Sequence, residues 1–266
     1  MYPKSALLNV MTQAAQKAAR GLIRDFGEVE HLQVSKKGTS DFVSTADTNS
    51  ESTLVYELRK ARPNFGFLLE ESGEIVGSDT SNRWIVDPLD GTTNFLHGIP
   101  HFSISIALER DGELHAGVVY EPVNDQMFTA ERGQGAYLNN NRIRVSARKN
   151  MKDAIFATGI PFAGRDGHSN FLQQLKILMP ETSGIRRFGS AALDLCYVAA
   201  GRFEGFWESG LNAWDIAAGI IIVREAGGFV SDLDGNKDML KSGDIIAAND
   251  YLHDGLSKLL NKAAKH

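Results

Sequence analysis

The chain has 266 residues, of which 42% are hydrophobic and 23% charged, an ordinary composition for a globular protein that buries its core without cross-links. A net charge of −5 gives no electrostatic reason to expect nucleic-acid binding, and no apolar stretch approaches the ~20 residues of a membrane span. The single cysteine, Cys196, excludes an internal disulfide and is expected to be a small buried hydrophobe. A reducing compartment and an N-terminus without an export signal predict a cytoplasmic protein.

The N-terminal part of the chain is predicted to form two helices and a short strand. Apolar residues recur at helical spacing over 5–26, which indicates an amphipathic helix. Thr48 and Glu51 have the spacing of a capping box and predict the start of a second helix, which must stop before Pro63. The apolar strand expected at 65–69 ends in two glutamates.

The next strand, 84–86, ends in two aspartates, Asp87 and Asp90, followed by Gly-Thr-Thr. Unit charges ~4 Å apart repel by roughly 4 kcal/mol at an effective dielectric of about 20, and a cation normally offsets such repulsion. Gly91 allows the main chain to approach a ligand closely, and Thr92 offers a hydroxyl and an N–H at the start of a short helix. The motif therefore predicts a metal ion on one side and a phosphate on the other.

Two alternatives to this interpretation stay open. Asp-Pro and Asp-Gly pairs mark turns in many proteins, so residues 87–91 are also compatible with an ordinary strand-to-helix loop. Phosphatases of the haloacid dehalogenase type also place an aspartate pair before Gly-Thr, and one of those aspartates becomes phosphorylated. Their aspartates lie two residues apart, whereas Asp87 and Asp90 lie three apart, which counts against the covalent scheme.

From Phe102 onward, apolar residues alternate with small or polar ones, which predicts an antiparallel meander. Its further strands are expected at 113–120, 126–130 and 142–145, with turns at 111–112, 122–125 and 139–141. After Asn150 the pattern changes to strands at 154–158, 203–207, 228–231 and 244–248 and helices at 168–179, 190–200, 213–226 and 250–263. We therefore predict an α+β or layered α/β fold whose N-terminal lobe, 1–149, and C-terminal lobe, 150–266, form one integrated unit.

Acidic residues recur where the predicted strands end or the helices begin. They are Asp47, Glu70, Asp87, Asp90 and Asp215. Asp215 lies at the start of the nearly all-apolar helix 213–226, where capping is the ordinary role of a carboxylate. Asn212 already suits the cap, however, and a carboxylate on a buried helix needs a partner, which favours a metal ligand.

These motifs resemble the signatures of the inositol monophosphatases, a family of lithium-sensitive, magnesium-dependent sugar phosphatases. The matching segments are 41–47, Glu70-Glu71-Ser72, 84–95, 189–192 and Trp214-Asp215-Ile216-Ala217-Ala218-Gly219. The likeness runs in order from about residue 5 to about residue 260, and its two longest motifs are together highly specific. It implies the layered α/β/α/β/α sandwich of the sugar phosphatases.

The resemblance also implies a set of metal ligands. Glu70, Asp87 and the carbonyl of Leu89 would hold one Mg²⁺, and Asp87, Asp90 and Asp215 a second. Glu70 would face a third, weakly bound ion through water, so that two to three ions occupy the site. All of these ligands are hard oxygen atoms, which suit Mg²⁺ and argue against zinc.

Catalytic and substrate-binding roles follow from the same resemblance. The N–H groups of Gly91 and Thr92 would bind phosphate oxygens, while Asp47 would orient Thr92 and act with Glu70 to position the attacking water. The hydroxylated part of the substrate would contact four residues, Asp90, Ala191, Glu208 and Asp215. Without the resemblance, Glu208 is only an acid at the rim of the site.

Other conspicuous residues carry weaker signals. Lys36 is compatible with reaching the site and equally with a solvated surface position. His97 and His101 lie four residues apart, but a glycine and a proline between them break any helix, which argues against a zinc site. Trp84 and Trp214 are expected in the core rather than against a ligand.

The expected reaction is hydrolysis of myo-inositol 1-phosphate, or of a similar polyol or sugar phosphate, by a metal-activated water. Phosphatases for fructose bisphosphate, histidinol phosphate and 3′-phosphoadenosine 5′-phosphate share the metal site, so these substrates stay open as alternatives. Some bacterial relatives also act as non-catalytic partners of the transcription machinery, in antitermination. The family resemblance further implies a homodimer, and neither a membrane nor direct nucleic-acid contact is expected.

Overall fold

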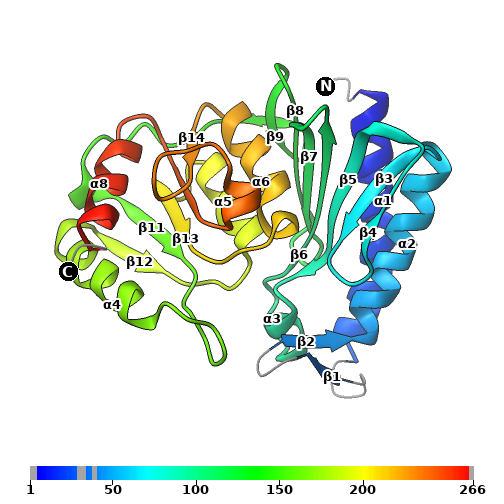
Figure 1. Ribbon diagram of the computed structural model, residues 1–266, viewed down its shortest axis with the longest axis horizontal. Coiled ribbons are helices and arrows are strands. Elements are labelled where there is room, and N and C mark those ends of the chain that lie inside the picture. Colours follow the sequence, from blue (N-terminus) through cyan, green and yellow to red (C-terminus); the bar gives the residue numbers. More distant parts are fainter. Residues whose placement is uncertain (1–4, 29–33, 38–40, 264–266) are drawn as a thin grey trace.

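The computed structural model stacks helices and sheets in five layers, and it describes residues 5–28, 34–37 and 41–263, with the backbone alone for 34–37 and 41–44. The helices of these layers are α1 (Ala6–Phe26), α2 (Thr45–Ala61), α4 (His168–Leu178), α5 (Ala191–Ala199), α6 (Ala213–Glu225) and α8 (His253–Ala263). In Figure 1, α1 and α2 form one outer layer, α5 and α6 the central layer, and α4 and α8 the other outer layer, with a sheet in each gap. The predicted layered α/β/α/β/α sandwich is confirmed.

The larger sheet has eight strands. They are β3 (Phe65–Leu69), β4 (Gly73–Ile75), β5 (Asp79–Asp90), β6 (Ser103–Arg110), β7 (Glu113–Glu121), β8 (Gln126–Glu131), β9 (Gly135–Leu138) and β10 (Asn141–Ile143). From β5 to β10 each strand pairs antiparallel with the next, which confirms the predicted meander. β3 instead pairs parallel with β5, with Leu69 opposite Val86, so the next residues, Glu70 and Asp87, lie side by side at one edge of the sheet.

The smaller sheet has five strands, in the order β12-β11-β13-β15-β14. They are β11 (Ile155–Thr158), β12 (Gly184–Arg186), β13 (Gly205–Glu208), β14 (Phe229–Ser231) and β15 (Ile245–Ala248). The remaining short elements are β1 (Val34–Lys37), β2 (Asp41–Ser44), α3 (Thr92–Leu96), α7 (Met239–Ser242) and the 3₁₀ turns Met151–Asp153 and Met179–Glu181. β1 and β2 form a separate antiparallel pair beside α3 (Figure 1).

The structure corrects two predicted element boundaries. α2 begins at Thr45 rather than at Thr48, whose hydroxyl donates to the Thr45 carbonyl inside the helix. The predicted capping box is therefore wrong, because the Glu51 carboxylate accepts its hydrogen bonds from a distant segment of the chain. The strand expected at 142–145 ends at Ile143, and β9 was not predicted because a four-residue strand that starts at a glycine has little periodicity.

Apolar side chains fill each space between layers. Trp84 and Phe102, both 0% exposed, pack with α1 and α2 on one face of the larger sheet, which confirms Trp84 as a core residue. The apolar face of α6 and the thiol of Cys196 lie in the central core between the sheets, as predicted for the cysteine. Among the described helices, none combines the length and the apolarity that crossing a membrane requires.

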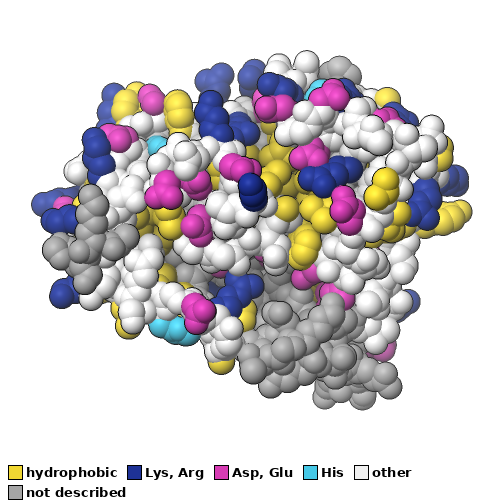
Figure 2. Space-filling model, in the orientation of Figure 1, with side chains coloured by type: hydrophobic (Ala, Val, Ile, Leu, Met, Phe, Trp, Pro, Cys, Tyr) yellow, Lys and Arg dark blue, Asp and Glu magenta, His cyan; other side chains and the backbone are white. Residues whose placement is uncertain are grey.

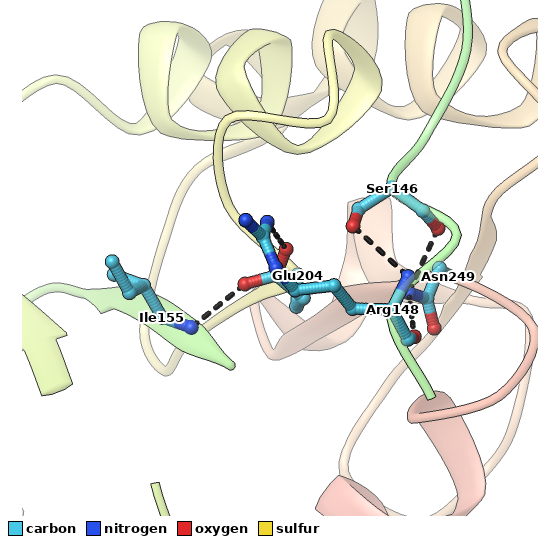
Figure 3. A network of polar contacts seen from close by, with 5 residues as sticks. All are labelled: Ser146, Arg148, Ile155, Glu204 and Asn249. Atoms are coloured by element: carbon cyan, nitrogen blue, oxygen red, sulfur yellow. Dashed lines mark hydrogen bonds and ion pairs between the residues drawn. The ribbon is translucent and has the colours of Figure 1, made fainter. Parts of the chain in front are cut away.

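Polar contacts fix the segment that joins the two sheets (Figure 3). The buried Glu204 carboxylate accepts from the Arg148 guanidinium at 2.8 Å and from the main-chain N–H of Ile155 at 2.7 Å. The Asn249 amide donates to the carbonyls of Ser146 and Arg148, both at 2.9 Å. The predicted lobe boundary near residue 150 falls in this segment, and the division into two lobes stays a prediction.

Candidate active site

The acidic residues singled out in the sequence come together at one edge of the larger sheet. Because β3 and β5 run parallel with Leu69 opposite Val86, Glu70 and Asp87 are the next residues on neighbouring strands. Asp90 is the last residue of β5, and Asp215 lies in the first turn of α6. The charges of Glu70, Asp90 and Asp215 all raise the pKa of Asp87, which places the four carboxylates in one electrostatic cluster.

A pocket of about 290 Å³ opens at this edge. It is lined by seven of the predicted site residues, Glu70, Asp90, Gly91, Thr92, Ala191, Glu208 and Asp215. Asp47, Asp87 and Leu89 are each 1% exposed and lie beneath the surface near these residues. Lys36 belongs to β1, whose side chains lie outside the described part of the structure.

The loop from Asp87 to Thr92 is held by its own polar groups. The Asp87 carboxylate accepts from the Leu89 N–H at 2.9 Å, and the Thr92 hydroxyl donates to the Leu89 carbonyl at 2.9 Å. Gly91 has φ +95°, and a Cβ there would stand 3.1 Å from the His101 carbonyl, so a glycine is required. Within the described part of the chain, no side chain caps the first turn of α3, and its N–H groups are available to an anion.

Asp90 connects this loop to the helix of the central layer. Its Oδ2 accepts from the Ser190 hydroxyl at 2.5 Å and from the Ala192 N–H at 2.8 Å. Both donors belong to the N-terminal turn of α5, which therefore lies directly over the loop after β5. The predicted contact residue Ala191 is brought to the pocket by these two hydrogen bonds.

Burial makes the charged forms of the site carboxylates unfavourable. It raises the pKa of Glu70 to about 8, with a further increase from the charge of Asp215. It raises the pKa of Asp87 well above the usual range, assisted by the charges of Glu70 and Asp90. For Asp90 burial raises the pKa to about 6, although the hydrogen bonds from Ser190 and Ala192 oppose the increase. The cluster therefore retains protons at neutral pH unless a cation offsets its charge.

The donor set fits a hard divalent cation in chemistry, but its side chains are not arranged around one. Among the described residues, no three Asp, Glu, His or Cys side chains form a group set to hold a single ion. Two of the carboxylates accept from nearby donors in the structure, Asp90 from the start of α5 and Asp87 from Leu89. Metal binding displaces protons from such ligands, and the oxygen-only set matches Mg²⁺. The ligand assignment stays a prediction.

Asp215 takes the capping role that the sequence left open. Its carboxylate accepts from the Asn212 N–H at 2.7 Å, in a capping box at the start of α6. The same side chain lines the pocket, so capping and ligand binding are compatible at this position. Trp214, which we expected in the core, also lines the pocket and is half-buried. The expectation holds in part, because the Trp214 side chain packs against the central core and the same residue lines the pocket.

Glu208, the last residue of β13, lines the pocket beside Gly159, the residue that follows β11. An added Cβ at Gly159 would overlap the Glu208 carboxylate, so this close contact exists only because residue 159 is a glycine. Burial, and then the charge of Asp215, raises the pKa of Glu208 to about 8. The carboxyl is therefore protonated over much of the neutral range and can donate as well as accept a hydrogen bond.

Four charged residues of the pocket were not predicted as site residues: Glu71, Arg165, Arg187 and Asp194. Asp194 is 1% exposed, and its Oδ1 has no hydrogen-bond partner among the described residues. The signal was present, since Asp194 is an acid on an otherwise apolar helix, as Asp215 is. The two arginines lie in loops, where sequence periodicity gives no indication of which side chains face a pocket.

Of the two histidines singled out in the sequence, His101 packs among aromatic side chains and His97 is exposed. The His101 ring packs 5.2 Å from the Phe188 ring and 5.9 Å from the Tyr197 ring. Burial lowers its pKa to about 4, so the ring is neutral at physiological pH.

On the face drawn in Figure 2, Lys and Arg side chains are interspersed with Asp and Glu side chains among the coloured atoms. That part of the surface therefore has no broad basic patch.

Comparison with known proteins agrees with this architecture. The chain is 58% identical over 259 residues to a protein of Mesorhizobium japonicum named inositol-1-monophosphatase, with 97% of each chain covered. It is 46% identical over 247 residues to a Pseudomonas aeruginosa protein named Nus factor SuhB, with 91% of each covered. The solved structure of the extragenic suppressor protein SuhB from Bartonella henselae superposes with a TM-score of 0.95 at 58% identity, covering 97% of this chain and 99% of that one. The model of the inositol monophosphatase family matches residues 4–265, and the chain belongs to this family.

Proposed function

We propose that the protein is a Mg²⁺-dependent phosphomonoesterase that hydrolyses a myo-inositol monophosphate to inositol and inorganic phosphate. The observation that carries this proposal is the convergence of buried carboxylates and uncapped main-chain N–H groups on one pocket. Acidic oxygens suit hard cations and N–H groups suit a phosphate, so one pocket offers both halves of a metal-phosphate complex. Family membership and the names of the close relatives support the same reaction class.

The proposed metal ligands are those expected from the family. Glu70, Asp87 and the Leu89 carbonyl would hold one Mg²⁺, and Asp87, Asp90 and Asp215 another. When bound, the ions would lower the pKa of a water and stabilise charge on the leaving oxygen. Asp87 is common to both sets, and its central place agrees with its interactions with Glu70, Asp90 and Asp215.

The chain's own residues would bind and orient the substrate. The N–H groups of Gly91 and Thr92 would hold phosphate oxygens, while Ala191 and Glu208 would contact the hydroxylated ring. The proposed action of Asp47 and Thr92 on the attacking water, with Glu70, requires the Thr92 hydroxyl to leave the Leu89 carbonyl, its acceptor in the structure. A protonated Glu208 is suited to a polyol, because it offers both a donor and an acceptor to neighbouring hydroxyl groups.

The substrate is tested by phosphate release from a panel of monoesters. The panel contains myo-inositol 1-phosphate, fructose 1,6-bisphosphate, histidinol phosphate and 3′-phosphoadenosine 5′-phosphate, each with Mg²⁺, with EDTA and with added Li⁺. We expect inositol phosphate to be the preferred substrate, EDTA to abolish release and Li⁺ to inhibit it. Dominant activity on the nucleotide, or full activity in EDTA, would overturn the assignment.

A second role is suggested by relatives named Nus factor SuhB, at 42–46% identity. Under this hypothesis the protein also contacts the transcription machinery through its surface, independently of turnover. Complementation of a deletion strain by an Asp87→Asn variant would support such a binding role. Loss of complementation would leave the phosphatase as the physiological activity. We further propose a cytoplasmic homodimer, which sedimentation and fractionation would test.

A further inference from the structure

One face of α2 changes from polar to apolar along its length. Ser50 and Glu51 lie three and four residues after Asp47, one helical turn further along, and all three are buried, with Asp47 1% exposed and Ser50 and Glu51 each 3% exposed. Leu54 and Leu58 continue the same face into the core and are 0% exposed. Buried polar side chains are unfavourable unless they are bonded, so the polar end of this face must have specific partners.

Ser50 bonds to the irregular last residues of β5, which carry the predicted ligands Asp87, Leu89 and Asp90. Its hydroxyl donates to the Pro88 carbonyl at 2.8 Å. This carbonyl and the Leu89 N–H belong to one planar peptide unit and point in opposite directions. Because the Leu89 N–H donates to Asp87, holding the carbonyl also fixes the direction from which Asp87 receives its hydrogen bond.

Glu51 bonds to the turn that follows the predicted ligand Glu70. Its Oε2 accepts from the Glu71 N–H at 2.9 Å, and its Oε1 accepts from the Ser72 hydroxyl. The Glu71 N–H belongs to the peptide unit that begins at Glu70, so this bond fixes the main chain on the C-terminal side of Glu70. A carboxylate that accepts two such bonds holds the turn in one orientation.

We propose that Ser50 and Glu51 are positioning residues, which hold the segments bearing Glu70 and Asp87 at the separation that shared cation binding needs. The two segments lie at the carboxyl ends of neighbouring parallel strands, and α2, which packs on β5, bonds to both through Ser50 and Glu51, so one helix face sets the position of each. Removing a group that orients a ligand typically weakens metal binding by about 10- to 100-fold. This inference rests on the proposed Mg²⁺-dependent function, and it concerns residues that touch neither the ion nor the substrate.

The experiment compares Ser50→Ala, Glu51→Ala and Glu51→Gln with two matched changes on the same helix. Thr53→Ala removes a hydroxyl that donates within the helix, to Asn49, and Glu57→Gln removes a carboxylate paired with Lys17 on the surface. Mg²⁺ binding is measured by calorimetry and by the rise in Tm that Mg²⁺ produces. The Mg²⁺ dependence of phosphate release is measured on the same preparations.

We expect Glu51→Ala to weaken Mg²⁺ binding by about 10-fold or more and Ser50→Ala by about 5-fold, with both controls unchanged. Glu51→Gln should bind Mg²⁺ within about 3-fold of wild type, because its amide oxygen still accepts from Glu71 and the Ser72 hydroxyl can turn to accept from its NH₂ group. The rate of phosphate release by Glu51→Ala should be partly recovered at saturating Mg²⁺. An unfolded variant would show no such recovery.

The outcomes separate this inference from the proposed function. A wild-type protein that neither binds Mg²⁺ nor releases phosphate refutes the proposed function. If wild type does both, and Ser50→Ala and Glu51→Ala bind Mg²⁺ as tightly as Thr53→Ala does, the positioning role is refuted alone. It is refuted equally if Glu51→Gln binds as weakly as Glu51→Ala, since charge rather than hydrogen bonding would then explain the loss. Should Glu51→Ala fail to fold, Ser50→Ala decides.

Discussion

Glu204 and Asp87 are buried to the same degree, each 1% exposed, but their surroundings differ. The Glu204 carboxylate is met by a guanidinium and a main-chain N–H, at the segment that joins the two sheets. Asp87 also receives an N–H, but its other neighbours are the acids Glu70, Asp90 and Asp215, which raise its pKa. Burial alone therefore does not separate a structural acid from a candidate ligand. The charge of the neighbours does.

Replacing Asp87 should give the largest effect on activity and little effect on folding. Asn keeps an acceptor for the Leu89 N–H but cannot supply the anionic carboxylate that the proposed ions require. We expect Asp87→Asn to lower the rate of phosphate release by roughly 100-fold or more, because a ligand proposed for both ions is lost. Steady-state assays at saturating Mg²⁺, with unfolding in urea as control, test this. A near-normal rate would mean that Asp87 is a structural acid, as Glu204 is.

Replacing Glu204 should lower the stability of the protein and have little effect on its activity. Glu204→Ala leaves the partly buried Ile155 N–H without its acceptor and releases Arg148. We expect the free energy of unfolding to fall by about 2–3 kcal/mol, with kcat at 25 °C largely retained. Glu113→Ala is the matched control, because its ion pair with Arg132 is exposed and 4.0 Å long, and such pairs contribute about 0–1 kcal/mol. Equal losses for both variants would contradict a structural role for Glu204.

For Glu208, the contrast between a structural acid and an acid of the candidate site can be tested through the pH dependence of stability. Its pKa is raised to about 8, from 4.5, by burial and then by the charge of Asp215. Between these pH values the folded protein holds a proton that the unfolded chain has released, so wild-type stability falls as the pH rises through this window. Gln does not titrate. The free energy of unfolding of Glu208→Gln, relative to that of wild type, should therefore rise by about 2 kcal/mol from about pH 5 to about pH 9.

Urea unfolding of both proteins in EDTA, at the two pH values, provides the measurement for Glu208. EDTA is needed because a bound cation would change the electrostatic surroundings of every acid in the pocket. A stability difference that is the same at both pH values would show that Glu208 ionises as an ordinary surface glutamate.

The smallest expected effect comes from moving Glu208 instead of removing it. The Cβ of Gly159→Ala would overlap the Glu208 carboxylate and push it from its place beside residue 159. We expect KM for inositol phosphate to rise by about 10-fold, with kcat changed less, because the ring contact is lost and the proposed metal ligands stay in place. Gly21→Ala serves as the control, since a Cβ there meets nothing within 4 Å. An unchanged KM would remove Glu208 from the substrate contacts.

The sequence by itself determined the elements and the chemistry of the proposed site. Helical spacing over 5–26 and alternation after Phe102 predicted α1 and the meander, because periodicity reports directly which residues face a core. The position of Glu70, Asp87 and Asp90 at strand ends indicated a cation site, since acids are costly there. The resemblance to a family then supplied roles, such as those of Ala191 and Glu208, that no local pattern carries.

Only the tertiary structure decided which groups meet. The spacing of Thr48 and Glu51 predicted a cap, but Glu51 bonds to Glu71 and Ser72, in a turn between two strands of the larger sheet. Arg165, Arg187 and Asp194 reach the pocket because loops and the start of α5 are folded over the end of β5, and local periodicity contains no information about that approach. A sequence pattern describes a residue's own helix or strand. The partner of a buried polar group is chosen by the packing of elements that are distant in the chain.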